Sequence, residues 1–202
     1  METSVPYDIA YYERVARGLA QAAAVSRNET NPETALFNIT ECARVSVGDP
    51  AARERPGAIN PGDPDFVISG IFFVAPTRDH MVLVVDNGFD VRLARIGIND
   101  SRPGNTVRTG EPAFLANTDT DKLFRQIIPK GRVGSSLYLP MWWDDLVIGM
   151  FNVAAMARYT FDEPDTRTGI LFANLAAATW MALGGPDYLA KIVASLPPWS
   201  GA

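Results

Sequence analysis

The first part of the chain carries apolar residues at intervals of three and four positions, the pattern of amphipathic helices. This spacing predicts an alanine-rich helix over residues 7–25. A second helix is predicted over residues 31–47. Asn31 is a residue type that caps helices, and Pro32 follows at the first helical position, where a missing N–H costs nothing.

The helical pattern breaks between residues 48 and 65, where four prolines alternate with three glycines. A loop of this length inside a compact domain is usually a linker or a functional segment. Two interpretations are therefore open, a linker between the helices and the next unit, or a lid over a pocket.

From Phe66 onward β-branched and aromatic residues dominate, and short apolar runs alternate with turn residues, which is typical of strands. Asn87-Gly88 is a strong turn signal. Six strands are predicted, over residues 66–74, 81–85, 91–98, 113–116, 135–140 and 146–155. Both faces of the last strand are apolar, so the sheet must be covered on both sides.

Four further helices are predicted in this part of the chain, over residues 103–109, 119–128, 162–183 and 187–196. The carboxylate of Asp162 is placed to cap the long helix. Gly184, Gly185 and Pro186 then end it.

Composition narrows the function classes. A net charge of −5 over 202 residues, without a basic stripe, argues against a nucleic-acid partner. Cys42 is the only cysteine, so neither an internal disulfide nor a cysteine-rich metal cluster is available. No apolar run approaches the roughly 20 residues that span a bilayer. No secretory signal is visible, and we expect a cytoplasmic protein without a membrane partner.

Four short motifs resemble those of GAF domains, small-molecule sensory modules related to PAS domains, over roughly residues 66–182. Gly104 followed by Thr109-Gly110-Glu111-Pro112 is similar to the family's G-x-x-x-x-T-G-x-P turn. Residues 135–140 resemble its S-x-x-x-x-P strand, and Val147-Ile148-Gly149 its V-I-G strand. Phe161 with Asp165 resembles the F-x-x-x-D that opens its last helix.

The resemblance implies an α+β fold with a six-stranded antiparallel sheet. Terminal helices would cover one face and often dimerise, and pocket-capping helices would cover the other. The helix over residues 7–25 would then pair with the one over residues 162–183. The chain would divide into N-terminal helices and a Pro/Gly-rich loop (residues 1–65), the GAF-like domain (66–183), and a short helix and tail (184–202).

Departures from the family's patterns remove some of its ligands. Members that bind cyclic nucleotides carry Asn-Lys after the V-I-G strand, where this chain has Ala155-Met156. One branch reduces free methionine sulfoxide with several cysteines, and the bilin-binding branch needs a cysteine within the domain. Cys42 lies outside the matching region. We expect no cofactor.

Few residues outside the pocket suggest chemistry. His80, the only histidine, lies in a predicted turn, where a solvated side chain fits better than an axial haem ligand, and it supplies too few ligands for zinc. Cys42 is expected to be a buried structural thiol. Trp142 and Trp143 beside a turn are expected to pack against the N-terminal helices or a partner, or to contact a ligand.

The candidate site is the expected pocket between the sheet and its capping helices. Asn152 lies mid-strand in an apolar run, Ser136 and Tyr138 alternate on the neighbouring strand, and a buried polar group is costly unless it is paired. Pairing within the protein is the plain alternative to ligand binding. The predicted ligand-binding residues are Phe73, Arg95, Ile98, Phe124, Arg125, Ile127, Ser136, Tyr138 and Asn152, and the combination suits a small aromatic acid or a small anion.

Three functions follow from this reading. The first is a sensory or regulatory protein that binds a small molecule, dimerises through its terminal helices and signals through a separate protein. The alternative is a cofactor-independent lyase or hydrolase, in which Asn152, Tyr138, Arg95 or Arg125 orients or polarises the substrate. The third is a dimeric scaffold whose pocket is filled by its own side chains.

Overall fold

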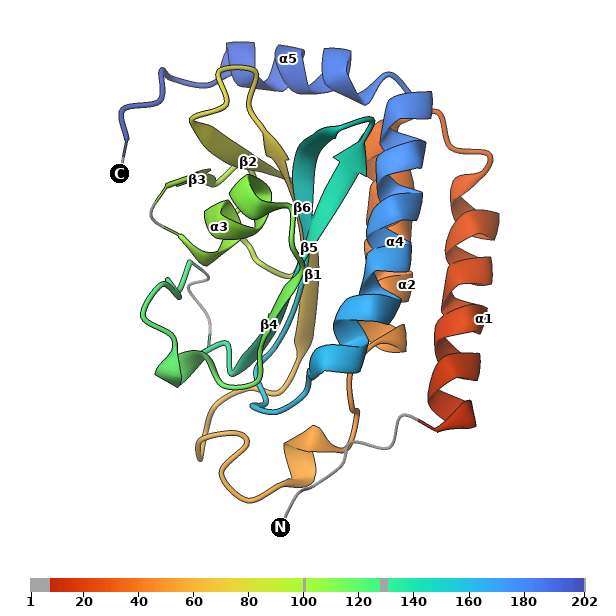
Figure 1. Cartoon of the computed structure of the whole chain (residues 1–202), viewed down its shortest axis with the longest axis vertical. Coiled ribbons are helices and arrows are strands. Elements are labelled where there is room, and N and C mark those ends of the chain that lie inside the picture. Colours follow the sequence, from red (N-terminus) through yellow and green to blue (C-terminus); the bar gives the residue numbers. More distant parts are fainter. Residues whose placement is uncertain (1–7, 100, 128–130, 202) are drawn as a thin grey trace.

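Six antiparallel strands form one sheet at the centre of the molecule, in the order β3-β2-β1-β6-β5-β4 (Figure 1). The computed structural model describes residues 8–99, 101–127 and 131–201. The strands are β1 (Val67–Val74), β2 (His80–Asn87), β3 (Arg95–Gly97), β4 (Ala113–Leu115), β5 (Ser135–Trp143) and β6 (Leu146–Ala155). The predicted α+β class and six-stranded antiparallel sheet are confirmed. Long apolar runs form the central pair β1 and β6, which are buried over nearly their whole length.

Three helices cover one face of the sheet: α1 (Ile9–Ser26), α2 (Pro32–Ser46) and α4 (Glu163–Ala182). Figure 1 shows α2 and α4 between the sheet and α1. As expected, α1 contacts α4, where Tyr11 bonds to Asp165, but α2 lies on the sheet beside α4 and provides most of the packing surface for α1. A Cβ at Gly18 would lie 2.0 Å from Ser46 Oγ, so the glycine is what lets α1 approach α2 closely.

The helix starts follow the sequence signals. Asn31 caps α2 by accepting a hydrogen bond from Thr34 N at 3.0 Å, with Pro32 in the first turn. Asp162 caps α4, and Asp165 Oδ2 in turn accepts a hydrogen bond from Asp162 N at 3.0 Å, which completes a capping box. Tyr7 and Ile128, the outer ends of two predicted helices, lie outside the described residues.

The other face of the sheet is covered by α3 (Arg102–Thr109), the 3₁₀ turn η2 (Thr118–Thr120) and connecting loops. The predicted helix over residues 119–128 is wrong over its described part. Asn117 Oδ1 accepts a hydrogen bond from Asp119 N, and Asp121 Oδ1 accepts one from Leu123 N. These local side-chain bonds offer the backbone an alternative to helical pairing.

The third strand is shorter than predicted, covering 95–97 rather than 91–98. The carboxylate of Asp86 accepts hydrogen bonds from Phe89 N (2.7 Å) and Val91 N (2.8 Å), which holds residues 88–94 as a loop. Asp90 and Leu93 have positive φ angles of 57° and 64° within it. The turn signal at Asn87-Gly88 therefore opens a wider loop than a two-residue hairpin.

The two ends of the sheet are closed by segments outside the strands. Residues 48–65, with the short η1 (Ala52–Glu54), pack beside the chain that follows β6, where Asp49 N donates to Thr160 O at 2.8 Å. After α4 the chain bends by 83° into α5 (Gly185–Ser195), and the tail then returns to β3, where Pro197 accepts a hydrogen bond from Arg95. Among the described helices none is by itself long and apolar enough to cross a membrane, and only the bent α4–α5 pair together has the length and composition.

Candidate ligand-binding cavity

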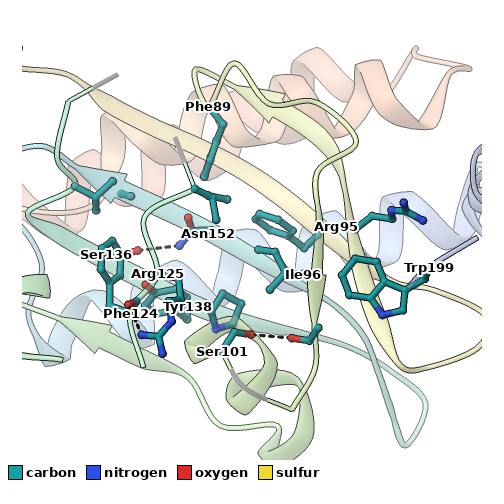
Figure 2. A pocket seen from close by; sticks show the side chains of 16 residues that line it. Phe89, Arg95, Ile96, Ser101, Phe124, Arg125, Ser136, Tyr138, Asn152 and Trp199 are labelled. Atoms are coloured by element: carbon teal, nitrogen blue, oxygen red, sulfur yellow. Dashed lines mark hydrogen bonds between the residues drawn. The ribbon is translucent and has the colours of Figure 1, made fainter. Parts of the chain in front are cut away.

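A cavity of about 410 Å³ lies on the α3 side of the sheet, within the size range of small-molecule sites. Figure 2 shows the side chains that surround it. Its wall consists of Phe72, Phe89, Arg95, Ile96, Gly97, Ser101, Pro103, Phe124, Arg125, Ile127, Val133, Ser136, Tyr138, Asn152, Ala154 and Trp199. The space contradicts the idea of a scaffold whose pocket is filled by its own side chains. None of residues 48–65 lines it, so that segment is not its lid.

Strand register brings the polar residues of the cavity together. Tyr138 on β5 lies directly opposite Asn152 on β6, and Ser136 lies two residues before Tyr138 on the same face. Asn152 Nδ2 donates to Ser136 Oγ at 2.9 Å and to the backbone carbonyl of Leu137 at 2.5 Å. The alternation of these residues along two strands is the sequence signal, and the structure places all three in the wall.

Tyr138 is a neutral phenol at any ordinary pH. Burial raises the pKa of Tyr138 to about 12, although its hydrogen bond with Ser136 acts in the opposite direction. The hydroxyl therefore keeps its proton and serves the cavity as a hydrogen-bond donor or acceptor without charge.

The two arginines of the predicted site lie at the cavity, but their guanidinium groups are engaged elsewhere. Arg95 Nη1 donates to the carbonyl of Pro197 at 2.6 Å, and its guanidinium lies 5.3 Å from the ring of Trp199. Arg125 Nη1 donates to the carbonyls of Lys122 (2.9 Å) and Phe124 (3.0 Å). Arg125 lies on a loop rather than on the capping helix expected for it.

Two apolar candidates, Phe73 and Ile98, do not line the cavity. Phe73 pairs with Val82 on the helix side of the sheet and stacks on Trp180 of α4, with ring centroids 3.8 Å apart. Its neighbour Phe72 lines the cavity instead. Successive residues of a strand face opposite sides of the sheet, and the prediction assigned Phe73 to the wrong side. Ile98 is buried in the apolar cluster near the cavity, and Ile96 reaches its wall. Phe124 and Ile127 line it as predicted, and their contact with a ligand stays a prediction.

Trp199 in the C-terminal tail is one of the lining residues that the sequence did not predict. Its ring stacks on His80, with centroids 4.8 Å apart and planes at 17°. His80 is only 4% exposed, so its assignment as a solvated turn residue is wrong. It begins β2 and bonds through Nδ1 to Asp79 Oδ1 at 2.6 Å. A tryptophan that follows two prolines in the C-terminal tail is a sequence signal for such a docking contact.

The remaining candidate residues lie away from the cavity. Cys42 is buried on α2 across the sheet, as expected, and burial raises the pKa of its thiol, which disfavours the reactive thiolate. Trp142 packs on Gly110 at the end of α3, with Nε1 donating to the Gly110 carbonyl at 3.3 Å, and not on the N-terminal helices. Within the described residues no group of three or more His, Cys, Asp or Glu side chains is placed to hold a metal ion.

Solved structures with the same fold come from different kinds of protein. A free methionine-R-sulfoxide reductase from Neisseria meningitidis, in complex with its substrate, is 18% identical, with a TM-score of 0.67 over 85% of this chain and 91% of that one. The GAF domain of a phosphoenolpyruvate-protein phosphotransferase from Coxiella burnetii is 15% identical, with a TM-score of 0.68 over 87% and 98%. The corresponding domain from Acinetobacter is 11% identical, with a TM-score of 0.60 over 94% and 98%.

At the level of sequence, comparison with curated proteins gives no match. The family model described as "GAF domain" matches residues 65–181, more than half of the chain. This span agrees with the motifs at Gly104, Ser135, Val147 and Phe161 and with the sheet order and layers described above. The chain belongs to the GAF domain family.

Proposed function

We propose that the protein is a sensory or regulatory GAF protein that holds a small organic molecule in the cavity between β5, β6 and α3. The observation that carries the proposal is the cavity itself, about 410 Å³ with aromatic walls and the polar group of Asn152, Ser136 and Tyr138. A concave, mostly apolar space with a few convergent polar groups is the usual form of a small-molecule site.

The test is a thermal-shift screen followed by calorimetry on the purified protein. The probes are indole, phenol, benzoate, indole-3-acetate, L-leucine and phosphate. At a hundredfold excess over its dissociation constant, a ligand raises stability by about 2.7 kcal/mol. Ala154 lies in the cavity wall, and the larger side chain of the Ala154→Leu variant is expected to fill the space and remove binding. Ala24→Leu on exposed α1 is the matched control. A screen without any shift, or binding that survives Ala154→Leu, contradicts the proposal.

We further propose that two copies associate through α1 and α4 and that a separate protein carries the output. Ile9 (78% exposed) and Tyr12 (50%) on α1 and Leu171 (46%) on α4 are large apolar side chains left in solvent on these helices. Light scattering is expected to give the mass of a dimer, and the double variant Tyr12→Asp/Leu171→Asp the mass of a monomer. A monomeric wild type contradicts this part of the proposal.

Catalysis in the same cavity is the second candidate, because the proteins of similar structure include an enzyme, the free methionine-R-sulfoxide reductase. A reductase that takes its two electrons from a pair of thiols, which become an internal disulfide, needs two cysteines, and this chain has only Cys42, which lies buried across the sheet. The group available for catalysis is the neutral hydroxyl of Tyr138, acting as a general acid with Asn152 as an orienting residue. Turnover of a bound probe, lost in Tyr138→Phe, would favour this candidate over the sensor.

A further inference from the structure

Asn152 presents an unsatisfied acceptor at the wall of the cavity. Its Nδ2 donates to the backbone carbonyl of Leu137, a group that only accepts, and this contact fixes which end of the amide is nitrogen. Oδ1 is therefore the other end, and none of the described residues donates a hydrogen bond to it. Figure 2 shows the side chain among the lining residues, with its bond to Ser136 dashed.

This acceptor is open to the cavity. Asn152 is only 5% exposed, but Oδ1 is not among the described buried atoms that lack a hydrogen-bond partner, so it is in contact with the cavity space, where a donor can reach it. Since Asn152 belongs to the wall, a molecule in the cavity is placed to supply an N–H or O–H group.

The charges around the cavity favour a neutral molecule. Among the described residues that line it, only Arg95 and Arg125 carry a full charge, and both guanidinium groups donate to backbone carbonyls. Ser101 Oγ is engaged as well, donating to Gly97 O at 2.9 Å and accepting from Gly104 N at 3.0 Å. Both guanidinium groups keep their charge, but their bonds lie at exposed positions where solvent screens them, so an anion held at the buried Asn152 would lose its hydration without a buried counter-charge from either arginine.

The apolar part of the wall favours a flat ring. Five of the lining side chains are aromatic: Phe72, Phe89, Phe124, Tyr138 and Trp199. Phe72 and Phe89 already meet edge to face, with centroids 6.1 Å apart and planes at 83°. Ring edges and faces arranged in this way pack well against a further aromatic ring.

We propose that the cavity takes a neutral aromatic molecule that donates a hydrogen bond to Asn152 Oδ1. This inference rests on the proposed function and narrows it, since the sequence alone pointed to an aromatic acid or an anion. The acceptor of Asn152 selects the donor, the aromatic wall selects the ring, and the two arginines, whose bonds lie at exposed positions, leave a carboxylate at Asn152 without a buried counter-charge.

Matched probe pairs test the inference on the unmodified protein by calorimetry. Indole is compared with N-methylindole, and phenol with anisole, because methylation removes the donor and keeps the ring. The donor of each pair is expected to bind roughly tenfold more tightly, which corresponds to about 1.4 kcal/mol. Benzoate and indole-3-acetate are expected to bind more weakly than phenol and indole.

A variant assigns the preference to Asn152. In Asn152→Leu the affinity ratio within each pair is expected to fall to about one, a loss of roughly tenfold. Asn60→Leu on the exposed loop is the matched control and keeps the ratio. Should Asn152→Leu fail to fold, because Leu137 O loses its donor, Asn152→Ser keeps a small polar group and is expected to shrink the ratio as well.

Three results would overturn the inference and leave the proposed function standing. They are equal affinity for methylated and unmethylated probes, tighter binding of the carboxylates, and binding of L-leucine or phosphate without binding of the aromatic probes. An unchanged ratio in both Asn152 variants would show that another residue accepts the bond, which also overturns it. If none of the probes binds, the proposed function fails as well.

Discussion

Asp165 joins three parts of the chain through a single buried carboxylate. Oδ1 accepts hydrogen bonds from Tyr11 Oη (2.6 Å) on α1 and Gly48 N (2.8 Å) in the loop after α2, and Oδ2 accepts one from Asp162 N. All three partners are hydrogen-bond donors, so the amide nitrogen of an asparagine at position 165 would face another donor instead of an acceptor. We expect Asp165→Asn to lower the free energy of unfolding by about 3 kcal/mol. Urea unfolding of the wild type and the variant measures this difference in the free energy of unfolding.

The matched control is Asp187→Asn in the exposed first turn of α5. It is expected to change stability by no more than about 0.5 kcal/mol. Equal losses in the two variants would contradict the role given to Asp165. The motif around Phe161 and Asp165 marks the start of α4 in the sequence, but the bonds to Tyr11 and Gly48 depend on tertiary packing that a local motif does not encode.

At the scale of single residues, alternation along strands predicted the polar part of the cavity. Ser136, Tyr138 and Asn152 lie together because β5 and β6 pair in the register that their apolar pattern requires. Phe73 fails for the same physical reason. Two adjacent phenylalanines on a strand buried on both faces give no sign of which one faces the cavity. Arg95 shows a second limit, since its partner Pro197 lies 102 residues away in sequence.

Among the connecting segments, Asp119 forms ion pairs with Arg132 and Arg158 that weaken in acid, and we call this group the Asp119 clamp. Arg158 Nη2 (2.6 Å) and Arg132 Nε (2.6 Å) both donate to Asp119, and the hydrogen bond from Arg158, then that from Arg132, holds the pKa of Asp119 below its usual value. A lowered folded pKa adds stability above the unfolded pKa of about 3.9 and loses it as pH falls through the folded value.

The clamp predicts a pH-dependent difference between wild type and Asp119→Asn. At pH 7 the variant is expected to be less stable by about 1 kcal/mol or less, because the side chain is 37% exposed and solvent screens the pairs. The difference should shrink as pH falls towards 2, and also in 1 M salt at pH 7. Urea midpoints across this range measure it, and a difference that grows on acidification would contradict the sign.

The C-terminal tail is an element that closes the cavity beside β3. Trp199 stacks on His80 and lies under Arg95, contacts of this kind contributing about 1 kcal/mol each. We expect Trp199→Ala to speed hydrogen exchange at the amides of β3 while lowering global stability only modestly. Exchange followed by mass spectrometry reports it. Trp143→Ala, at an exposed strand end away from the cavity, should leave β3 protection unchanged. Unchanged β3 exchange in Trp199→Ala would show that the tail does not hold the wall.

Elements with strong apolar periods were predictable, and those held by polar contacts were not. The long strands and α1, α2 and α4 follow from spacing and caps, because burial of one face decides them. The segment after β4 and the loop before β3 depend on Asn117, Asp121 and Asp86, whose side chains bond to nearby backbone. Apolar periodicity carries no information about such bonds.

At the scale of the whole molecule, the sheet separates two apolar clusters with different tasks. The larger cluster joins the helices to one face and contains Phe73, Trp180 and Cys42. The smaller one, on the opposite face, contains Phe72 and Tyr138 and borders the cavity. That both faces are covered follows from the sequence, since both faces of the last strand are apolar. The open space on one side does not, because it depends on how loops and the tail fill the area above the strands.

The two adjacent phenylalanines of β1 test this separation directly. Both are at most 1% exposed, but Phe73 stacks on Trp180 while Phe72 lines the cavity. Phe73→Ala is expected to lower stability by about 3–5 kcal/mol, the usual cost of an emptied aromatic site, and to leave the affinity for indole unchanged in the folded protein. Phe72→Ala should change that affinity, because it removes part of the wall. Calorimetry with indole, beside urea unfolding, separates the two effects. Equal changes in affinity would mean that the sheet transmits packing between its faces, and that stability and binding are not divided between them.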